Sequence, residues 1–141
     1  MKINLKNREL KPAIDFLENI DLKANKDSRH RTKLVKQIRM AFEEFVEEEK
    51  ELMIKFRLLD EENRLKKEEE RALQDVLSFS KEQSILLEEE VVIEGGMYAK
   101  NFDQIPRILE EYNGMLSGKE ADIYDRLMDE FEQEENKHVK D

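Results

Sequence analysis

Carboxylates are the most abundant groups in this sequence that could do chemistry. Asp and Glu supply 35 of the 141 residues, against 25 Lys and Arg and 2 His. General acid–base catalysis needs carboxylates in a desolvated pocket where their pKa values separate. Carboxylates along solvated helix faces lack that setting, so their number alone does not indicate a catalytic site.

One carboxylate stands apart, because Glu49 falls in an otherwise apolar helical row. A buried, titratable Glu49 is the one route by which the sequence suggests an enzyme, and a polar contact for a partner is a second reading. Alternatively, Glu49 reaches the rim of the core, or pairs with Lys or Arg to fix helix register. The structural readings are favoured, and we expect no enzymatic activity.

Metal and cofactor motifs are weak. Glu135-x-x-His138 has the spacing of half a di-iron carboxylate site, and Asp27-x-x-His30 is the other near match. Such a site needs two of these pairs and two further Glu, all facing inward. The absence of Cys excludes zinc–thiolate and cysteine chemistry. Gly95-Gly96 lacks the context of a dinucleotide-binding loop. We therefore expect no catalytic, metal-binding or cofactor-binding residues.

The charge is divided along the chain. Residues 1–42 hold 11 basic and 5 acidic side chains, net +6, whereas residues 43–141 hold 14 basic and 30 acidic, net −16. The boundary falls inside one expected helix, whose basic start opposes the helix macrodipole. An acidic element should compensate, and an internal one is favoured over a partner. The partner-binding candidates are Arg29, Arg31, Lys33, Lys36, Arg39, Glu47, Glu48 and Glu51.

The same charges bear on nucleic acid. The basic cluster lacks interleaved aromatic residues, and the remaining chain would repel phosphate. Nucleic-acid binding is therefore not expected. Rows of Glu and Asp on rigid helices can instead imitate a phosphate backbone, which gives an alternative hypothesis of an acidic inhibitor that mimics DNA. The plainer reading of those rows is a solubilising surface.

Hydrophobic periodicity predicts a mainly α protein. Residues 2–5 and 90–94 read as short strands that pair in a small ribbon. Asn7 is expected to cap a first helix to Asn19, with Pro12 tolerated only in its opening turn, and residues 21–27 form a loop. Ser28 is the expected N-cap of a long helix over residues 29–59.

The long helix carries apolar heptads. One row is Val35, Phe42, Glu49 and Phe56, and the other is Ile38, Phe45, Leu52 and Leu59. The apolar stripe is wider than a coiled-coil seam, so burial against two or more helices is expected. Such a helix would be about 46 Å long, against a radius of gyration of about 14 Å for a compact chain of this size. The protein should be elongated, or a second subunit of a homo-oligomer should cover the overhang.

The remaining elements are helical. A third helix is marked by Leu65 through Leu77, with a capping box at Ser80 that could start a fresh segment. Asp103, with Pro106 in the first turn, begins a helix that ends at Gly114. A capping box at Ser117 starts the last helix, giving a C-terminal helical hairpin. The tail over residues 132–141 should fray. The fold class is thus a helical bundle with one long central helix, in a single domain over residues 1–141.

The sequence also bears on location. No apolar run approaches the 18 residues of a membrane span, and the first residues lack the apolar stretch of a signal peptide. A protein of the cytoplasm, with no membrane partner, is expected.

Several segments resemble a family of small uncharacterised proteins from bacteriophages and prophages of Gram-positive bacteria. The likeness spans nearly the whole chain and carries no catalytic motif. After the long helix, where relatives have a Gly, this chain has residues 61–63, Glu-Glu-Asn. The segments are Ile3–Leu10 with Ala13–Leu17, Ser28–Leu34, Leu58–Glu61, and Leu116–Ala121 with Tyr124–Leu127.

The resemblance implies a phage-encoded accessory protein of the host cytoplasm or of particle assembly. We therefore expect a non-enzymatic interaction protein, in an assembly or adaptor role, that binds a phage structural protein or a host protein. The alternative is the acidic DNA mimic, acting on a host defence or DNA-processing protein.

Overall fold

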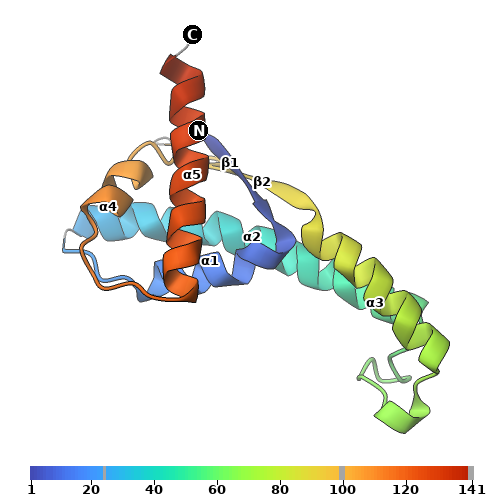
Figure 1. The fold of residues 1–141 in the computed structure, drawn as a ribbon. Coiled ribbons are helices and arrows are strands. Elements are labelled where there is room, and N and C mark those ends of the chain that lie inside the picture. The colour runs from blue at the N-terminus through green and yellow to red at the C-terminus, as the bar shows by residue number, and fades with distance from the viewer. Residues whose placement is uncertain (24, 99–100, 140–141) are drawn as a thin grey trace.

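The computed structural model describes residues 1–23, 25–98 and 101–139 and shows a helical head from which a helical arm projects (Figure 1). The arm consists of residues 46–88, and the other described residues form the head. The elements are β1 (Lys2–Lys6), α1 (Asn7–Asn19), α2 (Asn25–Lys55), the 3-10 turn η1 (Glu68–Glu70), α3 (Leu73–Glu88), β2 (Glu90–Glu94), α4 (Ile105–Glu111) and α5 (Lys119–Val139). A mainly helical bundle with a small ribbon is confirmed.

The two predicted strands form the antiparallel ribbon that the sequence indicated. Lys2 pairs with Glu94, and Lys6 pairs with Glu90. The alternating side chains send Ile3, Leu5 and Ile93 into the core, where each is at most 2% exposed. The ribbon therefore joins the start of the chain to the base of the arm, where α3 ends.

Helix α1 begins as predicted, but its cap is different. Lys6 is the N-cap, and its backbone N–H donates to Glu9 Oε1 at 2.8 Å. Asn7, expected as the cap, lies in the first turn, buried, and its Nδ2 donates to the carbonyl of Leu86 at 2.8 Å. Pro12 lies inside the helix rather than in its opening turn. Asn7 thus fastens the head to the base of the arm.

Helix α2 has the expected length but lies about one turn earlier. It spans Asn25–Lys55 rather than 29–59, so Ser28 lies in its first turn and is not the N-cap. Its N-terminal half buries Leu34, Val35 and Ile38 in the head. Beyond Phe45 it packs against α3, and the heptad rows there are half-buried.

The arm is a hairpin of two helices with an irregular tip. The third helix begins at Leu73 rather than near Leu65, and it runs through Ser80 without a break. Residues 56–72 form turns, in which Leu59 and Leu65 make an isolated antiparallel bridge. Asp60 stabilises the tip because its Oδ1 accepts the backbone N–H groups of Glu62 at 2.8 Å and Arg64 at 3.0 Å.

The C-terminal elements differ in detail from the expected hairpin. Helix α4 has Gln104, not Asp103, at its N-cap and ends at Glu111, before Gly114. Tyr124 of α5 donates its hydroxyl to the carbonyl of Leu109 at 2.9 Å, which joins the two helices. Fraying was expected from Glu132, whereas α5 continues to Val139 and buries Glu134.

One arginine holds α5 against the start of the chain. Arg126 Nε donates to Glu9 Oε2 at 2.9 Å, and Arg126 Nη2 donates to the carbonyl of Asn4 at 3.0 Å. Arg126 Nη1 also lies 2.9 Å from Glu130 Oε2. Glu130 in turn accepts the backbone N–H of Asn4 at 2.7 Å. This network fixes α5 beside β1 and α1.

Candidate functional site

One side of α2 faces solvent along almost its whole length. Its buried positions, such as Leu34, Ile38 and Phe45, lie on one side of the helix, and the side chains on the opposite side are exposed, although the turn that follows β2 borders part of that side. Successive positions along this side are three or four residues apart, which is the spacing of one helix face. This side, here called the outer face of α2, consists of Lys26, Arg29, Lys33, Lys36, Met40, Glu44, Glu47, Glu51 and Ile54, all exposed.

The outer face divides into a basic and an acidic half. The basic half runs from Lys26 to Lys36, the acidic half from Glu44 to Glu51, and Met40 lies between them, 55% exposed. Among the described residues, no side chain of either half forms an ion pair. The internal acidic neighbour that the sequence favoured therefore does not cover the basic half within the described part of the chain.

A hollow lies beside the basic half. The turn that follows β2 packs against α2 and encloses about 520 Å³ with it. A smaller hollow of about 220 Å³ adjoins it and is lined by Lys26, Arg29, His30, Lys33 and Tyr98. Two exposed methionines, polar groups and the turn itself border the larger hollow. Its lining is Lys33, Lys36, Gln37, Met40, Gly95, Gly96, Met97 and Tyr98.

The turn needs its glycine. Gly96 has φ +58°, and a Cβ there would lie 3.3 Å from Gln37 Nε2. A residue with a side chain would strain this backbone and crowd α2. Gly96 therefore lets the turn approach α2 closely enough to form the hollow.

Two predicted basic residues lie elsewhere. Arg31 donates to the carbonyl of Ile20 at 2.5 Å, at the end of α1. Arg39 pairs with Glu18 of α1. Both therefore help α1 pack on α2, and only Arg29, Lys33 and Lys36 of the predicted cations belong to the outer face.

The three acidic residues predicted to bind a partner lie close to one another on α2. Glu47 and Glu51 belong to the outer face, and Glu48 lies at its edge. Loss of water contacts raises the pKa of the Glu48 carboxyl, and the carboxylates of Glu44, Glu89 and Glu51 raise it further. A group of like charges is thus concentrated at the root of the arm.

The surroundings of Glu49 are those of a residue that links two helices. It is half-buried between α2 and α3, and its Oε2 accepts a hydrogen bond from Gln83 Nε2 at 3.0 Å. The bond joins the two arm helices, and the partner of Glu49 is therefore an amide and not the Lys or Arg that the sequence suggested.

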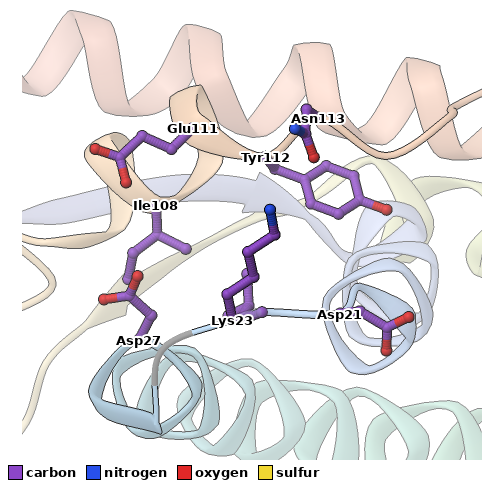
Figure 2. A pocket seen from close by; sticks show the side chains of 8 residues that line it. Asp21, Lys23, Asp27, Ile108, Glu111, Tyr112 and Asn113 are labelled. Atoms are coloured by element: carbon purple, nitrogen blue, oxygen red, sulfur yellow. The ribbon is translucent and has the colours of Figure 1, made fainter.

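A separate pocket of about 240 Å³ lies between the start of α2 and α4 (Figure 2). Lys23 extends into it from below, between Ile108 and Tyr112. At its edge Arg107 Nη2 lies 2.8 Å from Asp27 Oδ1, and Arg107 Nη1 lies 3.0 Å from Glu111 Oε2. The hydrogen bond from Arg107 lowers the pKa of Asp27. Because Asp27 is already engaged in joining α2 to α4, it is poorly placed as a general base.

The metal motifs find no support among the residues that the structure describes. Within residues 1–23, 25–98 and 101–139 there is no group of three or more His, Asp or Glu placed to hold a metal ion. The side chain of His138 lies outside the described part, so the pair with Glu135 is not placed. No helix within the same ranges is long and apolar enough to cross a membrane.

A family model described as "Protein of unknown function (DUF1617)" matches residues 1–138. The chain belongs to the DUF1617 family. No curated protein and no solved structure matches the sequence. The family assignment agrees with the expected membership of a family of uncharacterised proteins, and the match covers both the head and the arm.

Sequence reasoning missed part of the site in this DUF1617 chain. It identified the charges but not Met40, Gly96 or Tyr98, which border the hollow. Gly95-Gly96, followed by Met97 and Tyr98, was the available signal. A turn needing a positive φ, followed by two apolar residues, can place those residues against a neighbouring helix.

Proposed function

We propose that this DUF1617 protein is a non-enzymatic interaction protein that binds another protein through the outer face of α2. One observation supports the proposal above the others: charged side chains of both signs occupy a single solvated face without ion pairs in the described part of the chain. Charge in such an arrangement is available for an intermolecular partner and gives specificity and faster association.

The chemistry of the hollow favours a protein over a nucleic acid. Met40, Met97 and Tyr98 border it, and Met97 is fully exposed. Flexible methionines adapt to apolar side chains of a partner, whereas Lys33 and Lys36 attract its carboxylates. The net charge of −10 would repel a polyphosphate. The expected ligand is an acidic segment that carries an apolar side chain.

The proposed setting is a phage-infected or lysogenic Gram-positive cell. The resemblance of several segments to phage and prophage proteins supports it. In the host cytoplasm the protein would act as an assembly or adaptor protein on a phage structural protein or a host protein.

The test is the binding of a fluorescent peptide made of repeated Glu-Glu-Leu units. Wild type should bind it at low salt and release it at high salt. Lys33→Glu with Lys36→Glu should weaken binding at least about tenfold, since each reversal removes one attraction and adds one repulsion. The matched control, Lys50→Glu with Lys81→Glu, changes the net charge equally on the arm and should bind like wild type.

Three outcomes would contradict the proposal. One is no binding at low salt by wild type that is monomeric under the conditions of the assay, and another is equal binding by both double variants. The third is tighter binding of a labelled DNA duplex through the same two lysines, which would establish the nucleic-acid alternative instead.

A second candidate rests on the carboxylates around Glu48. Burial raises the pKa of Glu48, and the nearby carboxylates of Glu44, Glu89 and Glu51 raise it further. Carboxylates grouped in this way are a feature that a phosphate mimic requires. An acidic inhibitor would bind a basic DNA-processing or host defence protein through Glu47, Glu48 and Glu51. DNA should compete with that binding, and reversal of all three residues to Lys should abolish it. Unchanged binding by the triple variant would exclude this role.

A further inference from the structure

We propose that the partner of the outer face of α2 is a second copy of this chain, bound antiparallel about a twofold axis through Met40. The inference rests on the proposed function, because it names the partner of the same face. A twofold interface brings one patch against itself, so every contact occurs twice and the assembly closes as a dimer.

The spacing of the outer face is symmetric about Met40. From Lys26 to Ile54 the positions are separated by 3, 4, 3, 4, 4, 3, 4 and 3 residues, which reads the same in both directions. Two antiparallel copies can therefore align all nine positions at once. The face is about 42 Å long at 1.5 Å per residue.

The charges are arranged so that this alignment places opposite signs together. When Met40 meets Met40, positions whose numbers add up to 80 face each other. Apart from the central methionines, a basic residue then lies opposite an acidic one in every pair but the outermost, where Lys26 faces Ile54. The charge pairs are Arg29 with Glu51, Lys33 with Glu47, and Lys36 with Glu44, each formed twice.

The alignment also removes an unfavourable feature of the isolated helix. Cations near the N-terminus of a helix and carboxylates near its C-terminus both oppose the macrodipole. In the antiparallel pair, the acidic half of one copy lies beside the basic half of the other. The partner supplies the compensating charge that the described part of the chain does not provide.

The shape of the molecule leaves this face accessible. In Figure 1, α2 passes behind α1 and α5, and the head is built on the near side of the helix. All nine outer-face residues are exposed, and Met40 at the centre is 55% exposed. A methionine pair at the axis can adjust to the local separation of the two helices.

Charge reversal tests the pairing. Lys33→Glu with Lys36→Glu, and separately Glu44→Lys with Glu47→Lys, each place like charges opposite one another in four contacts. We expect wild type to be a dimer at low salt by light scattering coupled to size exclusion. Each double variant should be a monomer, with a dissociation constant raised on the order of 100-fold or more.

Two restorations make the test specific. The quadruple variant with all four reversals keeps the net charge of −10 and should dimerise again, because every pair is swapped. The two double variants, mixed, should form a one-to-one heterodimer, because Glu at positions 33, 36, 44 and 47 of one variant then faces Lys at the matching positions of the other, and the Arg29–Glu51 pairs are unchanged. Circular dichroism shows whether each variant is folded.

The inference is overturned if wild type is a monomer at low salt, if the double variants still dimerise, or if the quadruple variant and the mixture both stay monomeric. Its failure is distinguishable from failure of the proposed function. A monomeric chain that binds the Glu-Glu-Leu peptide through Lys33 and Lys36 retains the function and has a foreign partner. A monomer that binds no peptide loses both.

Discussion

Replacement of Asn7 by Ala tests how the head holds the arm. The side chain is 5% exposed, and its Nδ2 donates to the Leu86 carbonyl at 2.8 Å. The backbone N–H of Asn7 also donates to the carbonyl of Glu89 at 2.9 Å. Alanine keeps the backbone bond but leaves the Leu86 carbonyl without its side-chain donor, at the point where the arm leaves the head.

The expected loss follows from burial. The Leu86 carbonyl still accepts the backbone N–H of Glu89 at 3.2 Å, so the variant loses one buried side-chain hydrogen bond and leaves no orphaned acceptor. A hydrogen bond of this kind contributes about 1 kcal/mol, and the free energy of unfolding, measured by urea denaturation, should fall by about 1 kcal/mol. Hydrogen exchange of the last turn of α3 should accelerate as well.

Asn19 offers a matched control. It lies in the same helix and donates its Nδ2 to the Asp15 carbonyl at 2.7 Å, but it is exposed. Asn19→Ala should therefore cost under about 0.5 kcal/mol, because water replaces the lost donor. Equal losses for the two variants, or a loss under about 0.5 kcal/mol for Asn7→Ala, would refute the reasoning from burial.

Three further predictions concern the head. Arg126→Met should lower the free energy of unfolding by about 2 kcal/mol, because it removes the partly buried hydrogen bonds from Arg126 to Glu9 and to the Asn4 carbonyl together with the ion pair to Glu130; urea denaturation with a loss below about 0.5 kcal/mol would contradict this. Because Arg107 lowers the pKa of Asp27, stability from this carboxylate is present above its ordinary pKa and is lost as pH falls below about 4. Asp27→Asn should therefore show a shallower loss of stability with acid, and an unchanged slope would argue against the pair. Gly96→Ala should cost about 1–2 kcal/mol in thermal or urea unfolding because of its positive φ, and a neutral effect would show that the turn relaxes.

Local patterns in the sequence predicted the fold class well. Alternation of Ile3 and Leu5 with polar residues, and the β-branched run that includes Ile93, located both strands of the ribbon. Leu34, Ile38 and Phe45 recur at helical spacing and indicated a long helix. These signals are strong because the apolar side chains that produce them are the ones that folding buries.

Element ends were predicted less well, because tertiary contacts decide them. Asn7 has the chemistry of an N-cap, yet its side chain makes a buried bond to residue 86, far along the chain. Ser28 is a favourable cap, but α2 begins earlier, at Asn25. Ser80 has capping-box spacing within a helix that continues because Phe79 and Leu86 pack toward α2 on either side of it.

The sequence predicted which charged residues belong to the candidate site, but it did not predict how they are arranged in space. The sequence singled out basic and acidic residues of one helix, but Arg31 bonds to the end of α1 and Arg39 pairs with Glu18 of α1. Only the position of α1 distinguishes them from Lys33 and Lys36. The hollow needs the turn around Gly96 to pack on α2, a contact between distant segments that no local pattern reveals.

The most direct test of the account is the distance between identical spin labels in the two copies, measured by pulsed electron resonance. The chain has no cysteine, so Thr32→Cys and Lys55→Cys each give one labelling site beside the outer-face contacts. Antiparallel pairing about Met40 separates like positions along the axis by about 3 Å per residue from position 40. We therefore expect axial separations of about 24 Å at position 32 and about 45 Å at position 55. Equal, short distances at the two sites would show parallel pairing, and absence of dipolar coupling at low salt would show that the outer face of α2 does not bind a second copy.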